Sequence, residues 1–293
     1  IMSKKIVAIG GGHGLSMLLR TLDKYDLDLT AIVNVVDDGG SSGRIRKDIE
    51  ITPPGDLRLC ALALSSPSVL YGSSLQDLFA FRFDEGELDG HSLGNLILVA
   101  LTRQLGSFEK AVEKASELLN VRGKVLPASI SEVILCANSK SGLIRGQVNV
   151  ENTPDINNVF LDPKDVLPLD GVVDAILDAN HIIYAPGSLY SSVLPSLLIK
   201  DIQIALNKTI AKILMIMNLG TKGPDTEGMD GDDHLDALIN HGVRVDSVLC
   251  DKNSFFISKN RKGIKVATEN IRLNGEVHDE QLLGAYLSKV FDI

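Results

Sequence analysis

The chain has 293 residues, of which 44% are hydrophobic and 23% are charged, as is ordinary for a globular protein with a large buried core. Its formal net charge of −9 argues against a nucleic acid or an anionic membrane as the partner. Trp is absent and aromatic residues make up only 4%, so stacking platforms for single-stranded nucleic acid are not expected.

Three cysteines, Cys60, Cys136 and Cys250, are distant from one another in sequence and form no CxxC pair. This spacing is typical of free thiols in a reducing compartment, and it excludes a disulfide framework and a paired-cysteine zinc site. No apolar stretch approaches the length of a membrane span, and no signal peptide precedes the first expected strand. We therefore expect a cytoplasmic protein that binds neither membranes nor nucleic acids.

The first expected elements are a strand, a helix and a second strand. Lys5–Ile9 is a short apolar run that ends in glycines, Leu15–Leu22 has helical spacing, and Leu29–Val36 is a second apolar run rich in β-branched residues. A strand, a glycine turn, a helix and another strand are typical of a βαβ crossover, which builds a parallel sheet.

After the Pro53–Pro54 pair the pattern becomes helical. The predicted helices cover Leu57–Leu64, Leu75–Phe83, Leu93–Leu105 and Phe108–Leu119. Gly106 stands where the C-terminal end of a helix favours glycine. The run Leu96–Leu101 is apolar nearly all round, which indicates a fully buried helix.

Val133–Ala137 and Leu143–Val150 flank a polar turn, which predicts a β-hairpin. The later expected elements are a helix over Val172–Ala179 and strands over His181–Tyr184, Ile213–Met217, Ser247–Leu249 and Ile264–Ala267. The fold class is therefore α/β, with a Rossmann-like, doubly wound and mostly parallel sheet. We interpret residues 1–293 as one domain, with a core of about 1–55 and 171–293 and a largely helical insertion of about 56–170.

A glycine-rich motif directly follows the first expected strand and opens the first helix. It consists of Gly10, Gly11, Gly12, His13 and Gly14. Glycines permit positive φ and let an anion approach the backbone N–H groups at the positive end of a helix. The dinucleotide fingerprint GxGxxG fails in both registers, because Leu15 or Met17 occupies the third glycine position. The motif predicts a phosphate site, and the alternative is a tight strand-to-helix turn.

A second motif follows the second expected strand. Its candidate ligand-binding residues are Asp37, Asp38, Gly40, Ser41, Ser42 and Arg44. Loops at the carboxyl ends of parallel strands face one crevice, so this motif should face the first. The carboxylates can accept ribose hydroxyls or hold Mg²⁺ through water, the glycines can form a backbone nest, and the arginine can neutralise phosphate. The alternative is an Asp-Gly turn with solvated charges.

Two further motifs precede expected helices. The PPGDLR motif presents Asp56 as an N-cap and Arg58 in the first turn, and a purely structural cap is as good an interpretation as ligand binding. In the HSLGNL motif, His91 and Asn95 are candidate ligand contacts. There the alternative is that polar groups satisfy the free N–H groups of a buried helix start.

The fifth motif, APGSLYSS, again lies between an expected strand and a helix. Its candidate ligand-binding residues are Gly187, Ser188, Leu189, Tyr190 and Ser191. The glycine and the hydroxyl groups predict a second anion-binding helix N-terminus. Helix capping, the alternative, explains one serine but not three.

The sixth motif, Asn218–Asp236, is rich in Gly, Thr and Asp. From Asp230 it imitates a calcium-binding loop, but it lacks the glycine and the glutamate that such a loop requires. We interpret Asp232 and Asp233 as residues that cap and favour the start of the helix through Leu235. No HExxH, paired CxxC or GxSxG motif occurs in the sequence.

The motifs occur in a fixed order: GGGHGLS, DDGGSSGRIR, PPGDLR, HSLGNL, PGSLYSSVLP and the Asp-His-Leu stretch at 233–235. In this order they closely resemble the bacterial gluconeogenesis factor family, which is related to 2-phospho-L-lactate transferase. The resemblance spans nearly the whole chain, and an ordered set of motifs is far more specific than any one of them.

This resemblance implies a Rossmann-like core with an insertion, and a UDP-sugar, UDP-N-acetylglucosamine, as the ligand. It implies a cytoplasmic regulator of carbon flow to cell-envelope precursors, which supports cell shape, requires no cofactor and catalyses no reaction. The implied partners are glucosamine-6-phosphate synthase and a second copy of the chain in a homodimer.

The related transferase supplies an alternative, an Mg²⁺-dependent enzyme that acts on a nucleotide-diphosphate-linked substrate. In that reading Asp37 and Asp38 hold the metal. The scarcity of aromatic residues weighs against the flat apolar slot that a deazaflavin acceptor needs. A nicotinamide dinucleotide protein is a third reading, which the failed fingerprint weakens.

The chain departs from the family pattern at two places. His13 stands where family members commonly carry Thr, so an imidazole replaces one hydroxyl contact to phosphate. Thr221–Thr226 replaces a Thr-Gln-Pro-Gly-Glu-Thr type of loop, which puts the role of this loop in doubt. Near the C-terminus, Arg272 loosely matches an Arg-His-Asn stretch and is a further candidate contact to the sugar nucleotide.

Overall fold

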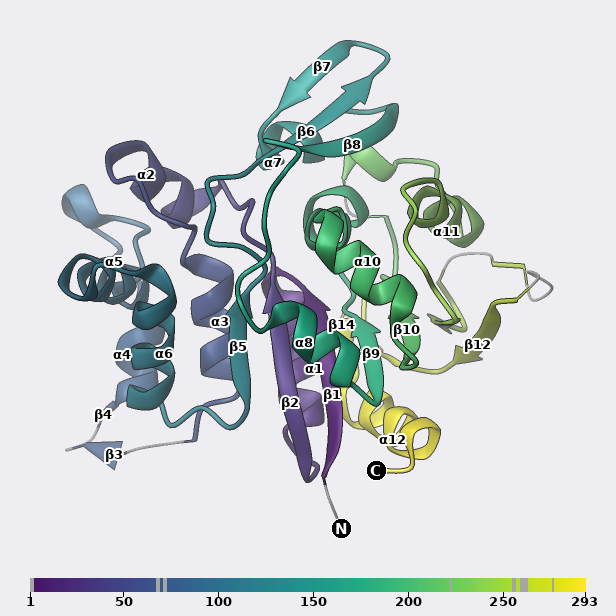
Figure 1. Ribbon diagram of the computed structural model, residues 1–293, viewed down its shortest axis with the longest axis horizontal. Coiled ribbons are helices and arrows are strands. Elements are labelled where there is room, and N and C mark those ends of the chain that lie inside the picture. The colour runs from purple at the N-terminus through teal and green to yellow at the C-terminus, as the bar shows by residue number, and fades with distance from the viewer. Residues whose placement is uncertain are drawn as a thin grey trace.

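The computed structural model describes residues 3–66, 69–70, 73–221, 223–254, 257–258, 263–275 and 277–293. A parallel sheet runs through the centre of the molecule, with the strand order β12-β11-β10-β9-β1-β2-β5 (Figure 1). Its strands are β1 (Lys4–Gly10), β2 (Leu27–Val33), β5 (Lys124–Pro127), β9 (His181–Tyr184), β10 (Lys212–Ile216), β11 (Ser247–Asp251) and β12 (Lys265–Glu269). The prediction of an α/β fold with a parallel, Rossmann-like sheet is confirmed.

Helices cover both faces of this sheet, which is why its strands are apolar on both sides. Ile6 and Ala8 of β1 belong to one core, while the alternating Val7 and Ile9 belong to the other. The first core includes α1 (Gly12–Leu22), α3 (Gly55–Ala63), α6 (Phe108–Leu118) and α12 (Glu280–Phe291). The second includes α8 (Val172–Asp178), α9 (Leu194–Leu197), α10 (Lys200–Lys208) and α11 (Gly231–Asn240). The sheet is therefore doubly wound.

The sheet reverses its winding direction between β1 and β9. From β1 the chain proceeds outward through β2 to β5, and from β9 it proceeds the other way through β10 and β11 to β12. β1 and β9 are neighbours in parallel register, with Ile9 opposite Tyr184. In open α/β sheets such a reversal opens a crevice at the carboxyl ends of the two strands, and this is where ligands bind.

The region 56–170 contains the expected helices α3, α4 (Leu75–Ala80), α5 (Leu93–Leu105) and α6. Gly106 ends α5 in the left-handed conformation, with φ of 69°. However, β5 also comes from this region and joins the central sheet beside β2. The expectation of a fully buried helix over Leu96–Leu101 is wrong, because only Leu98 and Val99 of that run are buried.

The predicted hairpin is confirmed as β6 (Ile134–Ser139) and β7 (Gly142–Arg145), and β8 (Ile156–Asp162) adds a third antiparallel strand. The predicted second strand extends too far, because α7 (Gln147–Glu151) replaces its last residues. The Asp38 carboxylate accepts the N–H groups of Gln147 and Val148 at 2.8 and 3.0 Å, which stabilises the helix start against the β-propensity of the valines. Figure 1 shows this small sheet above the carboxyl ends of the central strands.

The remaining elements are short, apart from α2 (Gly40–Asp48). They are β3 (Val69–Leu70), β4 (Ser73–Ser74), η1 (Gly86–Leu88), the π-helical turn η2 (Leu189–Val193), η3 (Pro224–Thr226), β13 (Arg272–Asn274) and β14 (Val277–His278). Among the described helices none is by itself both long and apolar enough to cross a membrane. One bent pair, Leu189–Leu197 with Lys200–Lys208, meets that test by length and composition only.

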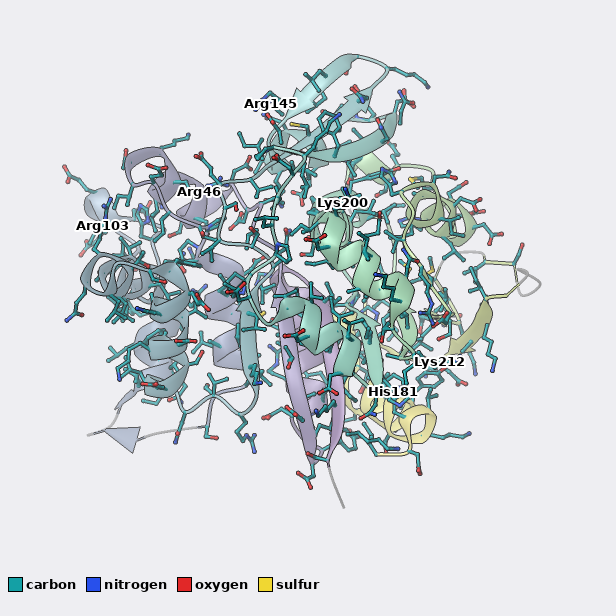
Figure 2. All side chains as sticks on the ribbon, viewed as in Figure 1. Arg46, Arg103, Arg145, His181, Lys200 and Lys212 are labelled. Atoms are coloured by element: carbon teal, nitrogen blue, oxygen red, sulfur yellow. The ribbon has the colours of Figure 1, made fainter. Side chains whose placement is uncertain are left out.

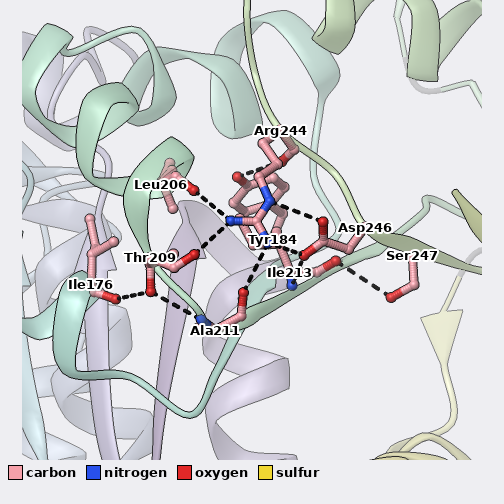
Figure 3. Close-up of polar contacts among 9 residues, drawn as sticks. All are labelled: Ile176, Tyr184, Leu206, Thr209, Ala211, Ile213, Arg244, Asp246 and Ser247. Carbon is pink, nitrogen blue, oxygen red and sulfur yellow. Dashed lines mark hydrogen bonds and ion pairs between the residues drawn. The ribbon is translucent and has the colours of Figure 1, made fainter. Parts of the chain in front are cut away.

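Arg244 forms hydrogen bonds with several elements in the half of the sheet that carries β9 (Figure 3). Its guanidinium forms an ion pair with Asp246 at 2.8 Å, and its carbonyl accepts a hydrogen bond from the Tyr184 hydroxyl at 2.9 Å. The same guanidinium donates to the carbonyl groups of Leu206, Thr209 and Ala211. Asp246 also accepts the N–H group of Ile213 at 2.9 Å. These bonds join the end of α10 to β9 and β10.

Candidate functional site

The loops that follow β1 and β9 meet directly above the reversal of the sheet. A Cβ atom on Gly14 would lie 1.7 Å from the carbonyl oxygen of Pro186, so only glycine allows this approach. Gly12, the first residue of α1, has φ of +58°, and Gly11 caps that helix without a side chain. The two glycine motifs, far apart in the sequence, therefore form one surface.

A cavity of about 370 Å³ lies between these loops, and we call it the switch-point cleft. Its lining comes from Gly11–Gly14 on one side and from Pro186–Ser188 with Ser192 on the other. The remaining lining residues are Glu151, Asn152, Asn218, Gly223, Pro224, Asp225 and His278. His13 thus lies in the cleft together with the glycines around it, and Gly10 is the last residue of β1 just below.

Asp56 lies at the start of α1, where a phosphate was expected. A Cβ atom on Gly11 would lie 2.6 Å from the Asp56 carboxylate, and this carboxylate accepts the N–H group of Gly12. Burial raises the pKa of Asp56 to about 7, and the nearby Asp37 acts in the same direction. The prediction of Asp56 as an N-cap is wrong, because α3 begins at Gly55 with Pro54 as its N-cap.

The second loop presents hydroxyl groups that bond to carboxylates. Ser188 donates to Asp225 at 3.2 Å, and Ser191 donates to Glu151. Burial raises the pKa of Asp225 to about 6, with the Ser188 hydrogen bond opposing that change. The cleft therefore combines glycine N–H groups with carboxylates that can accept hydrogen bonds from sugar hydroxyls.

Leu189 and Tyr190 point into the core, unlike Gly187 and Ser188 of the same motif, which line the cleft. Both side chains are buried in the core, at 1% and 4% exposure, and neither lines the cleft. The Tyr190 ring packs edge-on against His241 with 6.5 Å between the ring centres. These residues anchor η2, which holds Ser188 and Ser191 in position.

The Asp37–Arg44 motif forms the start of α2 where the sequence predicted a glycine nest. Asp37 accepts the N–H group of Gly39 at 3.0 Å and a hydrogen bond from Ser42, while burial raises its pKa. Both oxygens of Asp38 are engaged as the cap of α7. This pair is a poor fit to Mg²⁺, and no group of three or more His, Cys, Asp or Glu side chains among the described residues could hold a metal ion.

A second cavity of about 320 Å³ adjoins the first, because Glu151 lines both; we call it the arginine cavity. Its candidate residues from the sequence are Asp37, Gly40, Ser41, Ser42, Asp56, Arg58 and Asn95. Arg58 donates to Asn95 at 3.0 Å, and Asn95 donates to Ser41 at 3.1 Å. The Ser41 hydroxyl in turn bonds to the His91 ring at 3.1 Å. The second, third and fourth motifs thus meet here.

Two predicted arginines lie outside both linings. Arg44 donates to the carbonyl of Asp89 at 2.6 Å on the exposed side of α2. Arg272 bonds to Asp251 at 3.2 Å and to the carbonyl of Leu219 at 2.7 Å, which fixes β13 against the sheet. The roles of Arg44 and Arg272 as ligand contacts remain predictions.

Four cleft residues were not predicted as ligand contacts, namely Glu151, Asn218, Asp225 and His278, although Asn218 and Asp225 lie in the motif Asn218–Asp236. Asn218 follows β10 by two residues, so the rule that ligands lie at the carboxyl ends of strands could have found it. Asp225 belongs to the 221–226 loop whose role the sequence left in doubt, and Lys222 of that loop lies outside the described residues. Glu151 carried no signal, since it directly follows the segment Leu143–Val150, which was predicted to be a strand.

Known proteins are similar to this chain in both sequence and fold. A relative named gluconeogenesis factor from Halalkalibacterium halodurans is 45% identical over 251 residues, which cover 84% of this chain and 77% of the relative. A second relative of that name, from Bacillus subtilis, is 46% identical over 240 residues, covering 81% of this chain and 74% of the relative.

A crystal structure of a UPF0052 family member from Bacillus halodurans matches with a TM-score of 0.91 at 37% identity, over 98% of this chain and 99% of that chain. Residues 6–285 match the family described as 2-phospho-L-lactate transferase CofD. With nearly the whole chain matched in sequence and in fold, the protein belongs to the CofD family.

Proposed function

We propose that this protein is a cytoplasmic regulator of the gluconeogenesis factor type, which binds UDP-N-acetylglucosamine in the switch-point cleft and controls carbon flow to cell-envelope precursors. The observation that carries the proposal is the close approach of Gly14 to Pro186, because it joins two glycine loops into one surface at the reversal of the sheet. The names of the relatives support the regulatory part.

In this proposal the diphosphate lies against the N–H groups of His13 and Gly14 and of Gly187 and Ser188. Glu151 and Asp225 accept hydrogen bonds from sugar or ribose hydroxyls, since both line the cleft opposite the glycines. The bound phosphate charge favours the protonated form of Asp56, whose pKa burial already raises to about 7. Glucosamine-6-phosphate synthase is the proposed partner enzyme, and a homodimer is the proposed assembly.

The alternative function is a transferase that acts on a nucleotide-diphosphate-linked substrate. The adjacency of the two cavities at Glu151 favours it, because an acceptor in one could meet a donor in the other. The use of Asp38 as a helix cap weighs against the metal pair that this reading requires. We therefore place the regulator first.

Calorimetric titration with UDP-N-acetylglucosamine, GDP and NAD, with and without Mg²⁺, tests the ligand. We expect the UDP-sugar to bind more tightly than NAD. Tighter binding of NAD would overturn the proposal. Chromatography of the same mixtures tests turnover, because protein-dependent release of UDP or UMP at about 1 per second, an ordinary enzyme rate, would establish an enzyme instead, a transferase or a hydrolase.

A further inference from the structure

The central sheet ends at β5, and one side of this strand is open. β5 pairs with β2 and, among the described residues, with no strand on its other side. Ala128, the residue after β5, donates its N–H group to the carbonyl of Val33 at 2.8 Å. Main-chain groups alternate in direction along a strand, so those of Val125 point away from β2. No hydrogen bond to another described residue occupies the N–H or the carbonyl of Val125 on that side.

A groove of about 740 Å³ lies at this open side, and we call it the edge groove. In Figure 1, β5 lies between α6 and α8, and residues of these two helices form the walls of the groove. The strand itself contributes Lys124 and Leu126 to the lining. The groove therefore gives a partner access to the unpaired side of β5.

Five carboxylates and a single ammonium group, that of Lys124, line the edge groove. The carboxylates are those of Glu109, Glu113, Asp170, Asp174 and Asp178. Within the described residues, only Asp178 among them forms an ion pair, with Lys5. Figure 2 labels Arg103 on α5 and Lys200 on α10, and neither side chain extends over β5 or α8. The groove therefore has an excess of negative charge that these parts of the protein do not neutralise.

Both walls place like charges about one helical turn apart. Glu109 and Glu113 are four residues apart on α6, and so are Asp174 and Asp178 on α8, a spacing at which like charges weaken a helix. The helix dipole favours Glu109 and Asp174, which lie in the first turns, and Lys5 pairs with Asp178. No cation among the described residues pairs with Glu113. A cation bound in the groove would relieve the repulsion on both helices.

The charge of the groove and the chemistry of β5 decide between two occupants. A second copy of the chain would bring an identical set of carboxylates to the groove, and its own Pro127 has no N–H group to donate. An extended segment of another protein can instead add as a strand to an open edge, where main-chain hydrogen bonds supply the affinity. Because both walls are acidic, Lys or Arg side chains on either face of that strand meet carboxylates.

We propose that the edge groove is a docking surface for an extended, basic segment of a partner protein, which pairs with Val125 as a further strand of the central sheet. Lys124 and Pro127 at the ends of β5 limit the pairing to a few residues, which protects the edge from general aggregation. Half-buried Leu126 and exposed Leu177 offer the segment apolar contacts between its charges. The surface is separate from the switch-point cleft, since the two linings share no residue.

Fluorescence anisotropy with a labelled peptide of about eight residues that alternates Lys and Val tests the surface. We expect this peptide to bind the wild-type protein, and a peptide of the same length that alternates Glu and Val not to bind. The double variant Glu113→Lys with Asp174→Lys should weaken binding at least about tenfold, because two attractive charges become repulsive. Asp26→Lys with Glu85→Lys is the matched control, since both residues are exposed and neither lines the groove.

Two N-methylated versions of the Lys-Val peptide separate strand addition from simple charge attraction. One version carries methyl groups on the Lys amides and the other on the Val amides, so both keep the charge of the parent peptide. In an added strand only one of these two sets of amides faces β5. One methylated peptide should therefore lose at least about tenfold in affinity, while the other should bind like the parent.

Failure of the Lys-Val peptide to bind the wild type would overturn the proposal, and so would equal affinity in the wild type and the Glu113→Lys, Asp174→Lys variant. Equal affinity of the two methylated peptides would overturn it as well. The comparison of peptides uses wild-type protein alone, so it stands even where a variant fails to fold. UDP-N-acetylglucosamine takes no part in these measurements, so failure of the proposed function would leave them valid.

Discussion

The Asp56 carboxylate lies at the positive end of α1, against Gly11 and Gly12. A bound diphosphate would share that end with it, so two anions would meet unless Asp56 carries a proton. Its pKa of about 7 makes that proton available near neutral pH. The charge of Asp56, and with it the charge of the cleft, therefore changes with pH near neutrality.

Replacement of Asp56 by Asn should stabilise the protein more at pH 8 than at pH 5. The folded-state pKa of about 7 exceeds the ordinary 3.8, so the penalty of the buried charge is absent below pH 4, grows as the pH rises and is complete above pH 7. The increase in the free energy of unfolding on replacement should be larger at pH 8 than at pH 5 by up to about 3 kcal/mol, since each pK unit is worth about 1.4 kcal/mol. Urea titrations at both pH values measure it, with the exposed Asp84→Asn as the control. An equal effect of Asp56→Asn at both pH values would contradict the raised pKa.

Ser188→Ala should weaken binding of the UDP-sugar by about fivefold, the worth of one hydrogen bond near 1 kcal/mol. The hydroxyl bonds to Asp225 and lines the cleft. Ser116→Ala is the matched control, because the Ser116 hydroxyl on α6 has no hydrogen-bond partner among the described residues and does not line the cleft. Calorimetry compares the two variants, and equal affinity in both would show that Ser188 only supports the loop.

At the scale of elements, α7 links two motifs that are distant in sequence. Asp38 caps this helix, and Glu151 at its end lines both cavities. The sequence did not reveal this link. Val148 and Val150 favour a strand, and the capping carboxylate lies more than a hundred residues earlier. The strands β1, β2 and β9 were predictable, since each is a compact apolar run next to glycine or a turn.

Asp38→Ala should destabilise the protein by about 1 kcal/mol, because the first N–H groups of α7 lose their acceptor. It should also speed amide exchange in α7 and weaken ligand binding through Glu151. Asp28→Ala, an exposed residue of β2, is the control. Urea titration and hydrogen exchange give the answer, and unchanged exchange in α7 would rule out the capping role.

At the scale of the whole molecule, the reversal of the sheet between β1 and β9 brings the glycine loops together. Motif order along the chain indicated two loops at strand ends, but the adjacency of β1 and β9 depends on packing across residues 34–180. The β5 strand escaped prediction for a related reason. Its four residues include Lys124 and Pro127, and only pairing with β2 makes it a strand.

The Arg244 clamp should matter to global stability more than an exposed ion pair does. Arg244→Met removes the hydrogen bonds to three carbonyl groups and the ion pair with Asp246. The side chains of Arg244 and Asp246 are 25% and 26% exposed. We expect a loss of about 2 kcal/mol after allowance for this exposure. Arg145→Met, which breaks the exposed pair with Asp162, should cost about 0.5 kcal/mol. Similar urea midpoints for both variants would contradict the clamp.

The central claim is that one UDP-sugar bridges the two glycine loops at the reversal of the sheet. Hydrogen–deuterium exchange with and without UDP-N-acetylglucosamine tests it most directly, because the proposed contacts are backbone N–H groups. The account predicts that the ligand slows exchange in the peptides over 10–16 and 186–193 together, while peptides of α6 are unchanged. Slower exchange at one loop alone, or at neither, would contradict it.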